Sequence, residues 1–301
     1  MSFEKEVFVM NREYVIITDP CCDLPEEYLQ KNGLVVLPMA YTIESKTYTG
    51  QGNDRLSPKE FYAKMRAGNM PITAQVTPES ATITFEEYLK QGIDVLCIAF
   101  SSALSGTYNS ERLAAQELSE KYPQSKIYVV DSLCASLGEG LIVDYAVRMK
   151  LEGSDIDTVH EWLEANKGFV CHNFTVDDLF HLHRGGRVSK AAAIFGSMLN
   201  VKPVLHVDDE GRLIPIAKVR GRKQSLNALV DNMEKQLGSF RGKNPRVFIS
   251  HGDCEEDAQY VADQVKERCG VESFLINYIG PVIGAHSGPG TVALFFMGDE
   301  R

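Results

Sequence analysis

Long apolar runs and export signals are missing from this sequence. No stretch of its 301 residues approaches the ~18 to 20 apolar residues that a membrane-spanning helix needs. The opening segment, MSFEKEVFVMNREY, carries charges at positions 4, 5 and 6 and has no continuous apolar core. We therefore expect neither a membrane helix nor a secretory signal peptide.

Paired cysteines and clustered metal ligands are also missing. The seven cysteines include no C-x-x-C pair and follow no regular spacing. An odd number without a secretion signal indicates reduced thiols and a cytoplasmic protein. His181 and His183 lie two residues apart, which on a helix places them on roughly opposite faces and would suit a shared metal only on a strand. We predict two helix-surface histidines and no metal site.

Positive charge is scarce, with 31 Lys and Arg against 41 Asp and Glu and a net charge of -10. This balance argues against general binding to nucleic acid or to an anionic membrane, so any basic patch must be local. Two such clusters occur, at 183–187 with Lys190 and at 218–223. The remaining composition, 44% hydrophobic and 24% charged, is ordinary for a globular chain long enough for two domains.

The first half of the chain alternates short β-branched runs with amphipathic stretches. The expected strands are 14–18, 34–38, 94–100 and 127–131. The expected helices are 25–32, one opening at Ser57-Pro58, 78–91, 105–122 and 138–150. This alternation predicts an α/β domain with a mainly parallel, Rossmann-like sheet and helices on both faces. Ligands of such sheets collect beyond the carboxyl ends of the strands.

The second half predicts a mixed α/β domain. Its expected strands are 169–176, 202–207, 213–219, 246–251, 272–278 and 291–297, with helices around LHRGGRVSK and at 224–237 and 255–269. The DDEG turn between 202–207 and 213–219 indicates a β-hairpin. We place the domain boundary at the NKG turn, giving domains 1–168 and 169–301 with a ligand cleft between them.

Hydroxyl side chains crowd the carboxyl end of one expected strand, in AFSSALSGTYNS at 99–110. A serine nucleophile is one interpretation, but the hydrolase motif G-x-S-x-G fails on both sides of Ser105, where Ala103 and Thr107 stand. A phosphate loop is another, but neither G-x-G-x-x-G nor GxxxxGK[ST] occurs. Ser105 could instead cap the following helix. What remains is a hydroxyl-lined pocket for an anion at a helix N-terminus.

Two further candidates lie elsewhere in the chain. Thr73, in ITAQVTP, precedes an expected helix and could equally be a solvated loop residue. His286, in IGPVIGAHSGPG, lies in an expected glycine-dense loop. A lone histidine there is often structural, but the glycines would let the backbone approach a ligand closely.

Several segments together resemble the DegV family of bacterial fatty-acid-binding proteins over nearly the full length. The family's T-D-S-x-x-D-L-P is similar to 18–25, and its T-S-Q-P-S-P to 73–78. Its S-S-x-L-S-G-T-Y is 101–108 without a change. Its G-G-R-I-S, K-P-I-L and G-x-V-I-G-x-H-x-G-P-G resemble, in order, 185–189, 202–205 and 280–290.

The resemblance implies a protein that binds one long-chain fatty acid between its domains and presents the carboxylate to a separate fatty-acid kinase. It implies no catalysis and no cofactor of its own, since ATP and Mg²⁺ would belong to the kinase, which makes an acyl phosphate for phospholipid synthesis. The positions similar to the family's head-group network are Thr73, Ser105 and His286. Further residues of the same motifs could support that network: Ser101, Ser102, Gly106, Thr107 and Gly284.

Elementary energetics agrees with such a carrier. At ~0.8 kcal/mol per CH₂, burying a tail of about fifteen carbons gains on the order of 10 kcal/mol, which is ample after the cost of association. A buried Arg partner would hold the carboxylate strongly and blunt its attack on a phosphoryl group, whereas hydroxyls and an imidazole donate weaker neutral hydrogen bonds. The sequence therefore predicts that neutral groups hold the acid without reacting with it.

Two arginines and several apolar residues are further candidates, for kinase docking and for the tail pocket. We hypothesise that Arg184 and Arg187 contact the kinase or compensate charge near its nucleotide; solvated residues balancing nearby acids are the alternative. Apolar residues that could line either a core or the tail pocket are Phe174, Ile194, Phe195, Met198 and Ile283. The competing functions are a Ser105/His286 acyl hydrolase and a nucleotide-binding or phosphotransfer domain.

Overall fold

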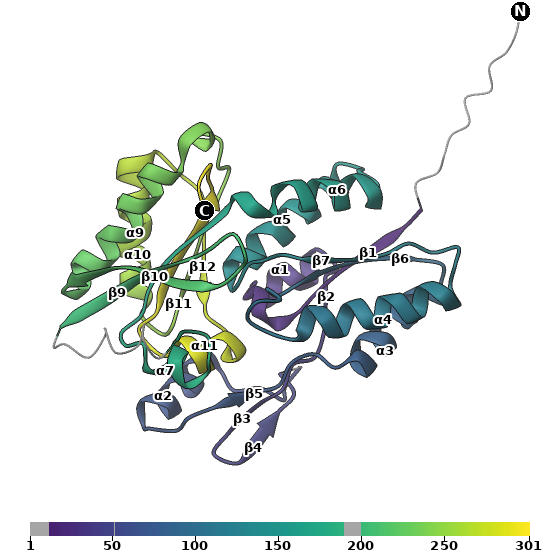
Figure 1. Cartoon of the computed structure of the whole chain (residues 1–301), viewed down its shortest axis with the longest axis horizontal. Helices are drawn as coiled ribbons and strands as arrows, with labels where there is room; N and C mark the ends of the chain where they lie inside the picture. Colours follow the sequence, from purple (N-terminus) through teal and green to yellow (C-terminus); the bar gives the residue numbers. More distant parts are fainter. Residues whose placement is uncertain (1–11, 51, 190–199) are drawn as a thin grey trace, which may run out of the picture.

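A four-stranded parallel sheet organises the first half of the chain in the order β2-β1-β6-β7. The computed structural model describes residues 12–50, 52–189 and 200–301 (Figure 1). The sheet consists of β1 (Tyr14–Thr18), β2 (Val35–Val36), β6 (Asp94–Ala99) and β7 (Ile127–Asp131). Every neighbouring pair is parallel, as the alternation of strands and helices predicts.

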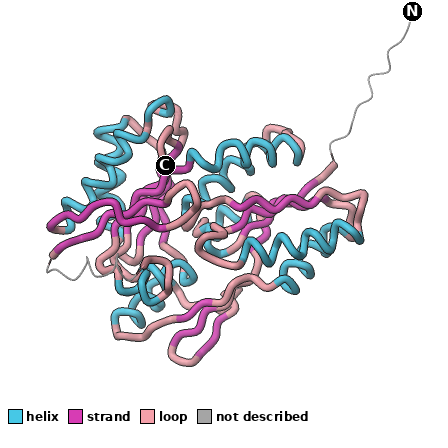
Figure 2. The backbone as a smooth tube through the Cα atoms, in the orientation of Figure 1, coloured by secondary structure: helices cyan, strands magenta, loops and turns pink. Residues whose placement is uncertain are grey.

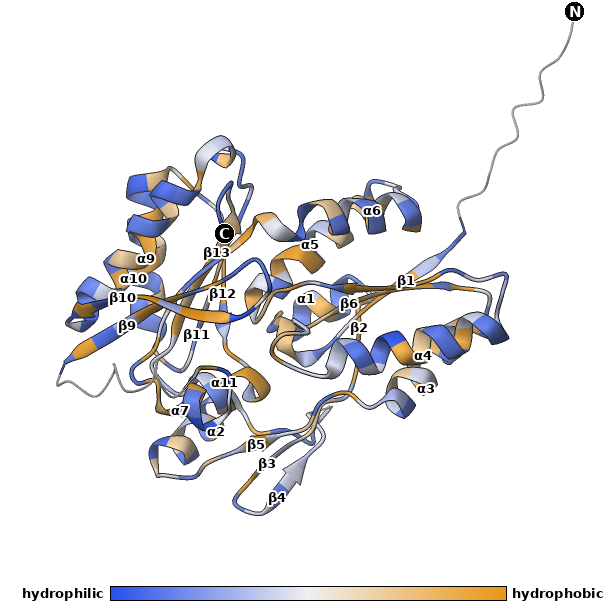
Figure 3. Cartoon of the chain, viewed as in Figure 1, coloured by the Kyte–Doolittle hydropathy of each residue, from blue (hydrophilic) through white to orange (hydrophobic). Residues whose placement is uncertain are grey.

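Helices cover both faces of this sheet. On one face lie α3 (Pro78–Leu89) and α4 (Thr107–Lys121), and on the other α5 (Leu137–Leu151) and α6 (Ile156–Asn166). Successive residues of a strand point to opposite faces, so Val15 packs toward α3 and α4 while Ile16 packs toward α5. With both faces covered, the strands are continuously apolar, which Figure 3 shows as orange along β1 and β6.

The second half forms a mixed six-stranded sheet in the order β10-β9-β8-β13-β11-β12. Its strands are β8 (Val170–Thr175), β9 (Val201–Val207), β10 (Leu213–Arg220), β11 (Val247–His251), β12 (Phe274–Tyr278) and β13 (Val292–Met297). Strands β9 and β10 pair antiparallel, which confirms the predicted hairpin. Helices α9 (Arg222–Gln236) and α10 (Glu255–Cys269) pack on one face.

Helix α5 lies between the two sheets and joins their cores. Its buried residues belong to one apolar cluster with Ile16 and Ile98 of the parallel sheet and with Phe248 and Phe295 of the mixed sheet. Figure 2 shows the helix between the two groups of strands. The first strand of the mixed sheet begins at Val170; the predicted domain boundary at residue 168 stays a prediction.

A third, smaller sheet and two helices complete the site region. The sheet has the order β4-β3-β5 and consists of β3 (Tyr41–Ile43), β4 (Lys46–Tyr48) and β5 (Ile72–Thr73). It packs with α2 (Pro58–Arg66) and α11 (Pro281–Ser287) around buried aromatic rings (Figure 1). Two further described helices are α1 (Glu26–Lys31), which lies near β2 in Figure 1, and α7 (Phe180–Arg184), which contacts α11.

Two negative findings apply to the described residues. No helix among them combines the length and the apolar content that crossing a bilayer requires. The seven cysteines all lie within the described ranges and form no disulfide.

Candidate functional site

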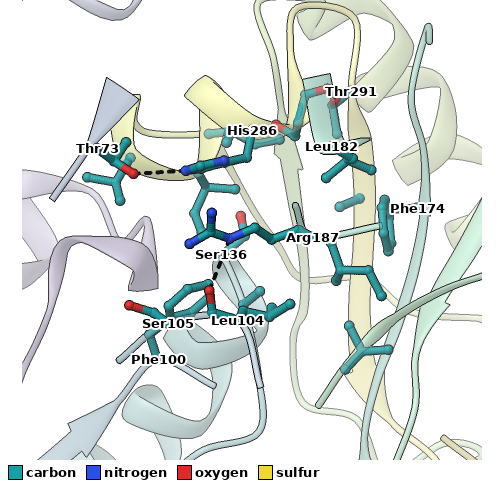
Figure 4. Close-up of a pocket in the computed structure, with 18 of the residues that line it drawn as sticks. Thr73, Phe100, Leu104, Ser105, Ser136, Phe174, Leu182, Arg187, His286 and Thr291 are labelled. Atoms are coloured by element: carbon teal, nitrogen blue, oxygen red, sulfur yellow. Dashed lines mark hydrogen bonds between the residues drawn. The ribbon is translucent and has the colours of Figure 1, made fainter. Parts of the chain in front are cut away.

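A largely apolar cavity opens between the two large sheets, just beyond the carboxyl ends of β6 and β7. Its volume is about 180 Å³ for the centres of water-sized molecules. Figure 4 shows a polar end, with Thr73, His286, Arg187 and Ser105, and an apolar wall beyond it. The apolar lining consists of Met39, Ala74, Phe100, Leu104, Ala135, Phe174, Leu182, Val207, Leu213, Ile279, Val282, Ile283, Ala293 and Phe295.

Strands β8 and β13 build one wall through their alternating side chains. Phe174 lies opposite Ala293, and His172 lies opposite Phe295, in the antiparallel register of the two strands. Residues two apart on a strand share a face, so all four side chains face the cavity. The cavity therefore runs along β13. Its polar end lies at Thr291, the residue before the strand, and its aromatic end lies at Phe295.

Thr73 and His286 meet at the polar end. Thr73 Oγ1 lies 2.8 Å from His286 Nε2, although 213 residues separate them in sequence. Thr73 ends the short strand β5, and His286 lies on α11, so neither stands in the loop that the sequence predicted. His286 Nδ1 is buried and has no hydrogen-bond partner among the described residues.

Ser105 reaches the same cavity from the turn before α4. Its hydroxyl lies 2.9 Å from Thr107 Oγ1 and accepts a hydrogen bond from the Thr107 backbone N–H. Ser105 is therefore not the N-cap of α4, which is Gly106, but its hydroxyl still satisfies the N–H of the first helical residue from one position earlier. Capping and cavity lining coexist in one side chain, and the structure brings Ser105, Thr73 and His286 to one cavity.

Arg187 also lines the cavity, which the sequence did not indicate. Figure 4 shows its side chain between His286 and the Leu104–Ser105 segment. Arg187 donates to the backbone oxygens of Leu104, at 3.1 Å, and of Gly185. No carboxylate among the described residues pairs with it. The polar end of the cavity therefore carries a partly buried cation to which residues 12–50, 52–189 and 200–301 supply no counterion.

The electrostatics of this end favour an anion. Burial, followed by the positive charges of Arg187 and Arg184, lowers the pKa of His286 to about 4. Burial also lowers the pKa of Arg187. At neutral pH the imidazole is therefore uncharged and can donate or accept one hydrogen bond at Nε2, while the positive charge resides on the guanidinium.

Arg184 braces the two elements that carry Thr73 and His286. Its guanidinium donates to the backbone oxygens of Pro71 and Ala285, both at 3.0 Å. It is half-buried and pairs with no carboxylate of the described residues. Since Pro71 precedes β5 and Ala285 precedes His286, this side chain holds together the two elements that carry Thr73 and His286.

The five supporting candidates lie around the cavity and do not line it. Ser101 donates to the Gly211 oxygen in the β9–β10 turn, and the backbone N–H of exposed Ser102 donates to Asp131. Thr107 accepts from the Val76 N–H. A methyl group at Gly106 would overlap the amide of Gln75, and one at Gly284 would lie 2.5 Å from Tyr62 Oη, so both glycines permit close packing.

The other predicted residues lie in the cavity, on α7 or in the undescribed segment. Phe174 and Ile283 line the cavity, whereas Ile194, Phe195 and Met198 lie outside the described residues. His181 and His183 lie on α7 as half-buried side chains, so the prediction that both are surface histidines is wrong. No three potential metal ligands cluster within the described ranges. Sequence reasoning missed Gln75, Ser136, His172, Ser287 and Thr291. Alternation along β8 and β13 was the available signal for His172 and Thr291.

A buried carboxyl network links both halves of the chain beside the cavity. Asp23, which is 6% exposed, accepts hydrogen bonds from Ser136 Oγ at 2.5 Å and from the Gly280 N–H at 2.8 Å. Ser136 Oγ also lies 2.8 Å from Ser250 Oγ of β11. Burial raises the pKa of Asp23 to about 7. Because Gly280 is the N-cap of α11, Asp23 connects the 3-10 turn that follows β1 to the helix that carries His286.

The fold and the cavity together define an α/β protein with a mainly apolar site between its two large sheets. The chain belongs to the DegV family, whose model, described as an uncharacterised protein of that family, matches residues 13–299. A DegV domain-containing protein of Clostridium perfringens is 47% identical over 290 residues, which covers 96% of this chain and 99% of that protein.

Solved structures of the family have the same architecture. A DegV family protein from Thermus thermophilus, described by its fatty-acid binding, is 30% identical, covers 95% of this chain and 99% of its own, and has a TM-score of 0.83. A stearic-acid-binding protein from Eubacterium ventriosum is 27% identical, covers 95% of this chain and 98% of its own, and has a TM-score of 0.86. Structural neighbours of this chain thus bind fatty acids.

Proposed function

We propose that this protein binds one long-chain fatty acid in the cavity and presents its carboxylate to a separate ATP-dependent fatty-acid kinase. The carboxylate lies at Thr73, Ser105 and His286, and the tail extends along β8 and β13. The observation that supports this most is the polar end of the cavity, where the Arg187 guanidinium has no counterion among the described residues. A fatty acid supplies both the missing anion and an apolar tail.

The cavity lining indicates that the tail supplies most of the affinity and that the head group is mainly positioned. Apolar side chains dominate the cavity, so the tail supplies affinity on the order of 10 kcal/mol before association costs. The head group then needs only positioning. Arg187 modifies the expectation of purely neutral donors, because its charge compensates the carboxylate at close range. The same charge suits the acyl phosphate product, which is more negative than the acid.

The transfer step belongs to the partner. A carboxylate oxygen of the bound fatty acid attacks the γ-phosphorus of ATP held with Mg²⁺ by the kinase, the bond to the β–γ bridging oxygen breaks, and ADP leaves with an acyl phosphate remaining. The roles of Arg184 and Arg187 in docking remain a proposal. Their half-buried position beside His286 leaves part of each side chain accessible at the site.

A kinase-coupled assay tests this function. Purified protein, fatty-acid kinase, ATP and Mg²⁺ are incubated, and acyl phosphate is trapped as the hydroxamate. The proposal expects product only with all components present, and strongly reduced product for Arg184→Glu/Arg187→Glu even when enough fatty acid is added to saturate the variant, because loss of the Arg187 charge also weakens lipid binding. Unchanged turnover in that variant would remove the docking role, and no product with the wild type would contradict presentation.

The geometry gives less support to a Ser105/His286 acyl hydrolase. His286 Nε2 contacts Thr73, the Ser105 hydroxyl contacts Thr107, and no described carboxylate orients His286 Nδ1. A nucleophile and its base should instead lie within hydrogen-bond reach, with a third group orienting the base. Hydrolysis of a chromogenic ester that is lost in Ser105→Ala would revive this alternative.

A further inference from the structure

Ser287 carries a buried hydroxyl that nothing in the described structure satisfies. It follows His286 on α11, lines the same cavity and is 6% exposed. Its Oγ is buried and has no hydrogen-bond partner among the described residues. A buried hydroxyl without a partner is costly, so such a group calls for an explanation.

The other hydroxyls of the cavity all have partners. Thr73 contacts His286, Ser105 contacts Thr107, Ser136 donates to Asp23, and Thr291 donates to the backbone oxygens of Ser287 and Gly288. The imidazole of His172 is also occupied, because Nε2 accepts from the Ala135 N–H and Nδ1 lies 3.0 Å from the Val170 oxygen. Within the described lining, Ser287 therefore carries the hydroxyl that has no partner within the protein.

The position of Ser287 along the cavity follows from β13. Thr291 bonds the Ser287 oxygen, and from Thr291 the cavity-facing residues of the strand continue to Phe295. Four residues of strand span ~13 Å. Ser287 therefore lies at the carboxylate end of the channel, one residue from His286, and the aromatic end lies about a strand's length away.

We propose that Ser287 makes this site selective for fatty acids that carry a hydroxyl group near the carboxyl end, at carbon 2 or 3. This inference rests on the proposed fatty-acid binding. A plain acyl chain leaves the Ser287 hydroxyl buried without a partner, whereas a substituent hydroxyl near the head group donates to it or accepts from it. A hydroxyl far along the chain faces the aromatic end and loses its hydration without compensation.

Competition binding tests the selectivity. The delipidated protein is offered equal amounts of stearate and of 2-, 3- and 12-hydroxystearate, and the bound acids are quantified by native mass spectrometry. We expect 2- or 3-hydroxystearate to exceed stearate by about threefold to tenfold, the ratio that one neutral hydrogen bond supplies, and 12-hydroxystearate to fall below it. Equal occupancy by stearate and the near-carboxyl hydroxy acids would overturn the proposal.

Two variants assign any preference to the side chain. Ser287→Ala should abolish the preference while binding stearate at least as well as the wild type. The matched control is Ser119→Ala, because the Ser119 hydroxyl donates to the Ala115 oxygen within α4, away from the cavity. This variant should keep the wild-type preference. A preference that survives in Ser287→Ala would contradict the assignment to Ser287.

Thermal unfolding checks that the hydroxyl is free in the protein itself. Because Ser287 Oγ bonds no described group, Ser287→Ala should unfold at the wild-type temperature or slightly above it. A clear fall in the unfolding temperature would show an internal partner and overturn the inference. Failure of the wild type to bind any of the four acids is a different result, since it contradicts fatty-acid binding itself.

Discussion

The guanidinium of Arg187 dominates the chemistry of the cavity at the scale of single residues. It lies beside a neutral imidazole, it donates to two backbone oxygens, and it pairs with no carboxylate of the described chain. A bound carboxylate would gain a charged partner there, in addition to neutral donors at Thr73, Ser105 and His286. On the proposed function, charge and hydroxyl geometry would together hold the head group.

Removing this charge should weaken ligand binding. For Arg187→Gln we expect the affinity for a long-chain fatty acid to fall by roughly ten- to a hundredfold, the range for losing a hydrogen bond to a charged group. Displacement of a fluorescent fatty acid measures the change. The control is Arg112→Gln on the exposed side of α4, which should bind as the wild type does. Equal affinity for Arg187→Gln would show that the carboxylate does not use the guanidinium.

The site residues were predictable to different degrees for physical reasons. Thr73, Ser105 and His286 were singled out together through the family motifs that contain them, and the structure brings all three to one cavity. Arg187 could not, because its place in the cavity depends on the Leu104 and Gly185 oxygens, which the fold brings to it. Ser287 becomes distinctive only once the partners of every neighbouring hydroxyl are known.

Helix α11 shows at the scale of elements why one part of the fold escaped prediction. Its sequence, PVIGAHS, reads as a glycine-dense loop, yet it is helical from Pro281 to Ser287. Gly284 allows the helix to lie against Tyr62, whose hydroxyl donates to the Ile279 oxygen at 2.9 Å. This tertiary packing overrides the low helix propensity of glycine. The β3–β4 hairpin was missed similarly, since Glu44 and Ser45 take its positive φ angles without a glycine.

Filling the space at Gly284 should therefore damage the site through its scaffold. The methyl group of Gly284→Ala would lie 2.5 Å from Tyr62 Oη, so either the ring or α11 must move. We expect a loss of about 1 to 3 kcal/mol in the free energy of unfolding, measured with urea, together with weaker fatty-acid binding. Gly168→Ala, which meets nothing within 4 Å, should change the stability little. Equal stabilities for the two variants would contradict this account of the packing.

The molecule as a whole is tied together by α5 and by the carboxyl of Asp23. The strands of the two large sheets were predicted because their apolar runs are strong, and β1, β7 and α10 have the expected bounds, whereas the sequence analysis missed α6 and the strands of the small sheet. The joining of the two sheets through one helix was not predictable, because periodicity does not say which of two sheets a buried face will meet. Asp23 adds a polar link, from the end of β1 to Ser136 and to the start of α11.

This link should make stability depend on pH. Burial raises the pKa of Asp23 from 3.8 to about 7, so the folded protein holds this proton more tightly than the unfolded chain does. The contribution of this proton to the free energy of unfolding is complete below pH ~4 and is lost as the pH rises toward 7. Asp23→Asn has no proton to lose, so its stability relative to the wild type should rise over this window, by up to about 4 kcal/mol, and then level off.

Urea unfolding of both proteins at pH 4, 5.5, 7 and 8 measures that difference, and the titrations common to both cancel. A difference that does not change with pH would show that Asp23 titrates alike in the folded and unfolded states.

We propose that the cavity holds one fatty acid by its tail, with the carboxylate at Thr73, Ser105, His286 and Arg187. The decisive experiment is native mass spectrometry of the purified protein, followed by solvent extraction and identification of the released acid. We expect one long-chain acyl chain per protein molecule, and a marked loss of it in Arg187→Gln. Protein that carries no fatty acid, and takes up none when stearate is added, would rule this binding mode out.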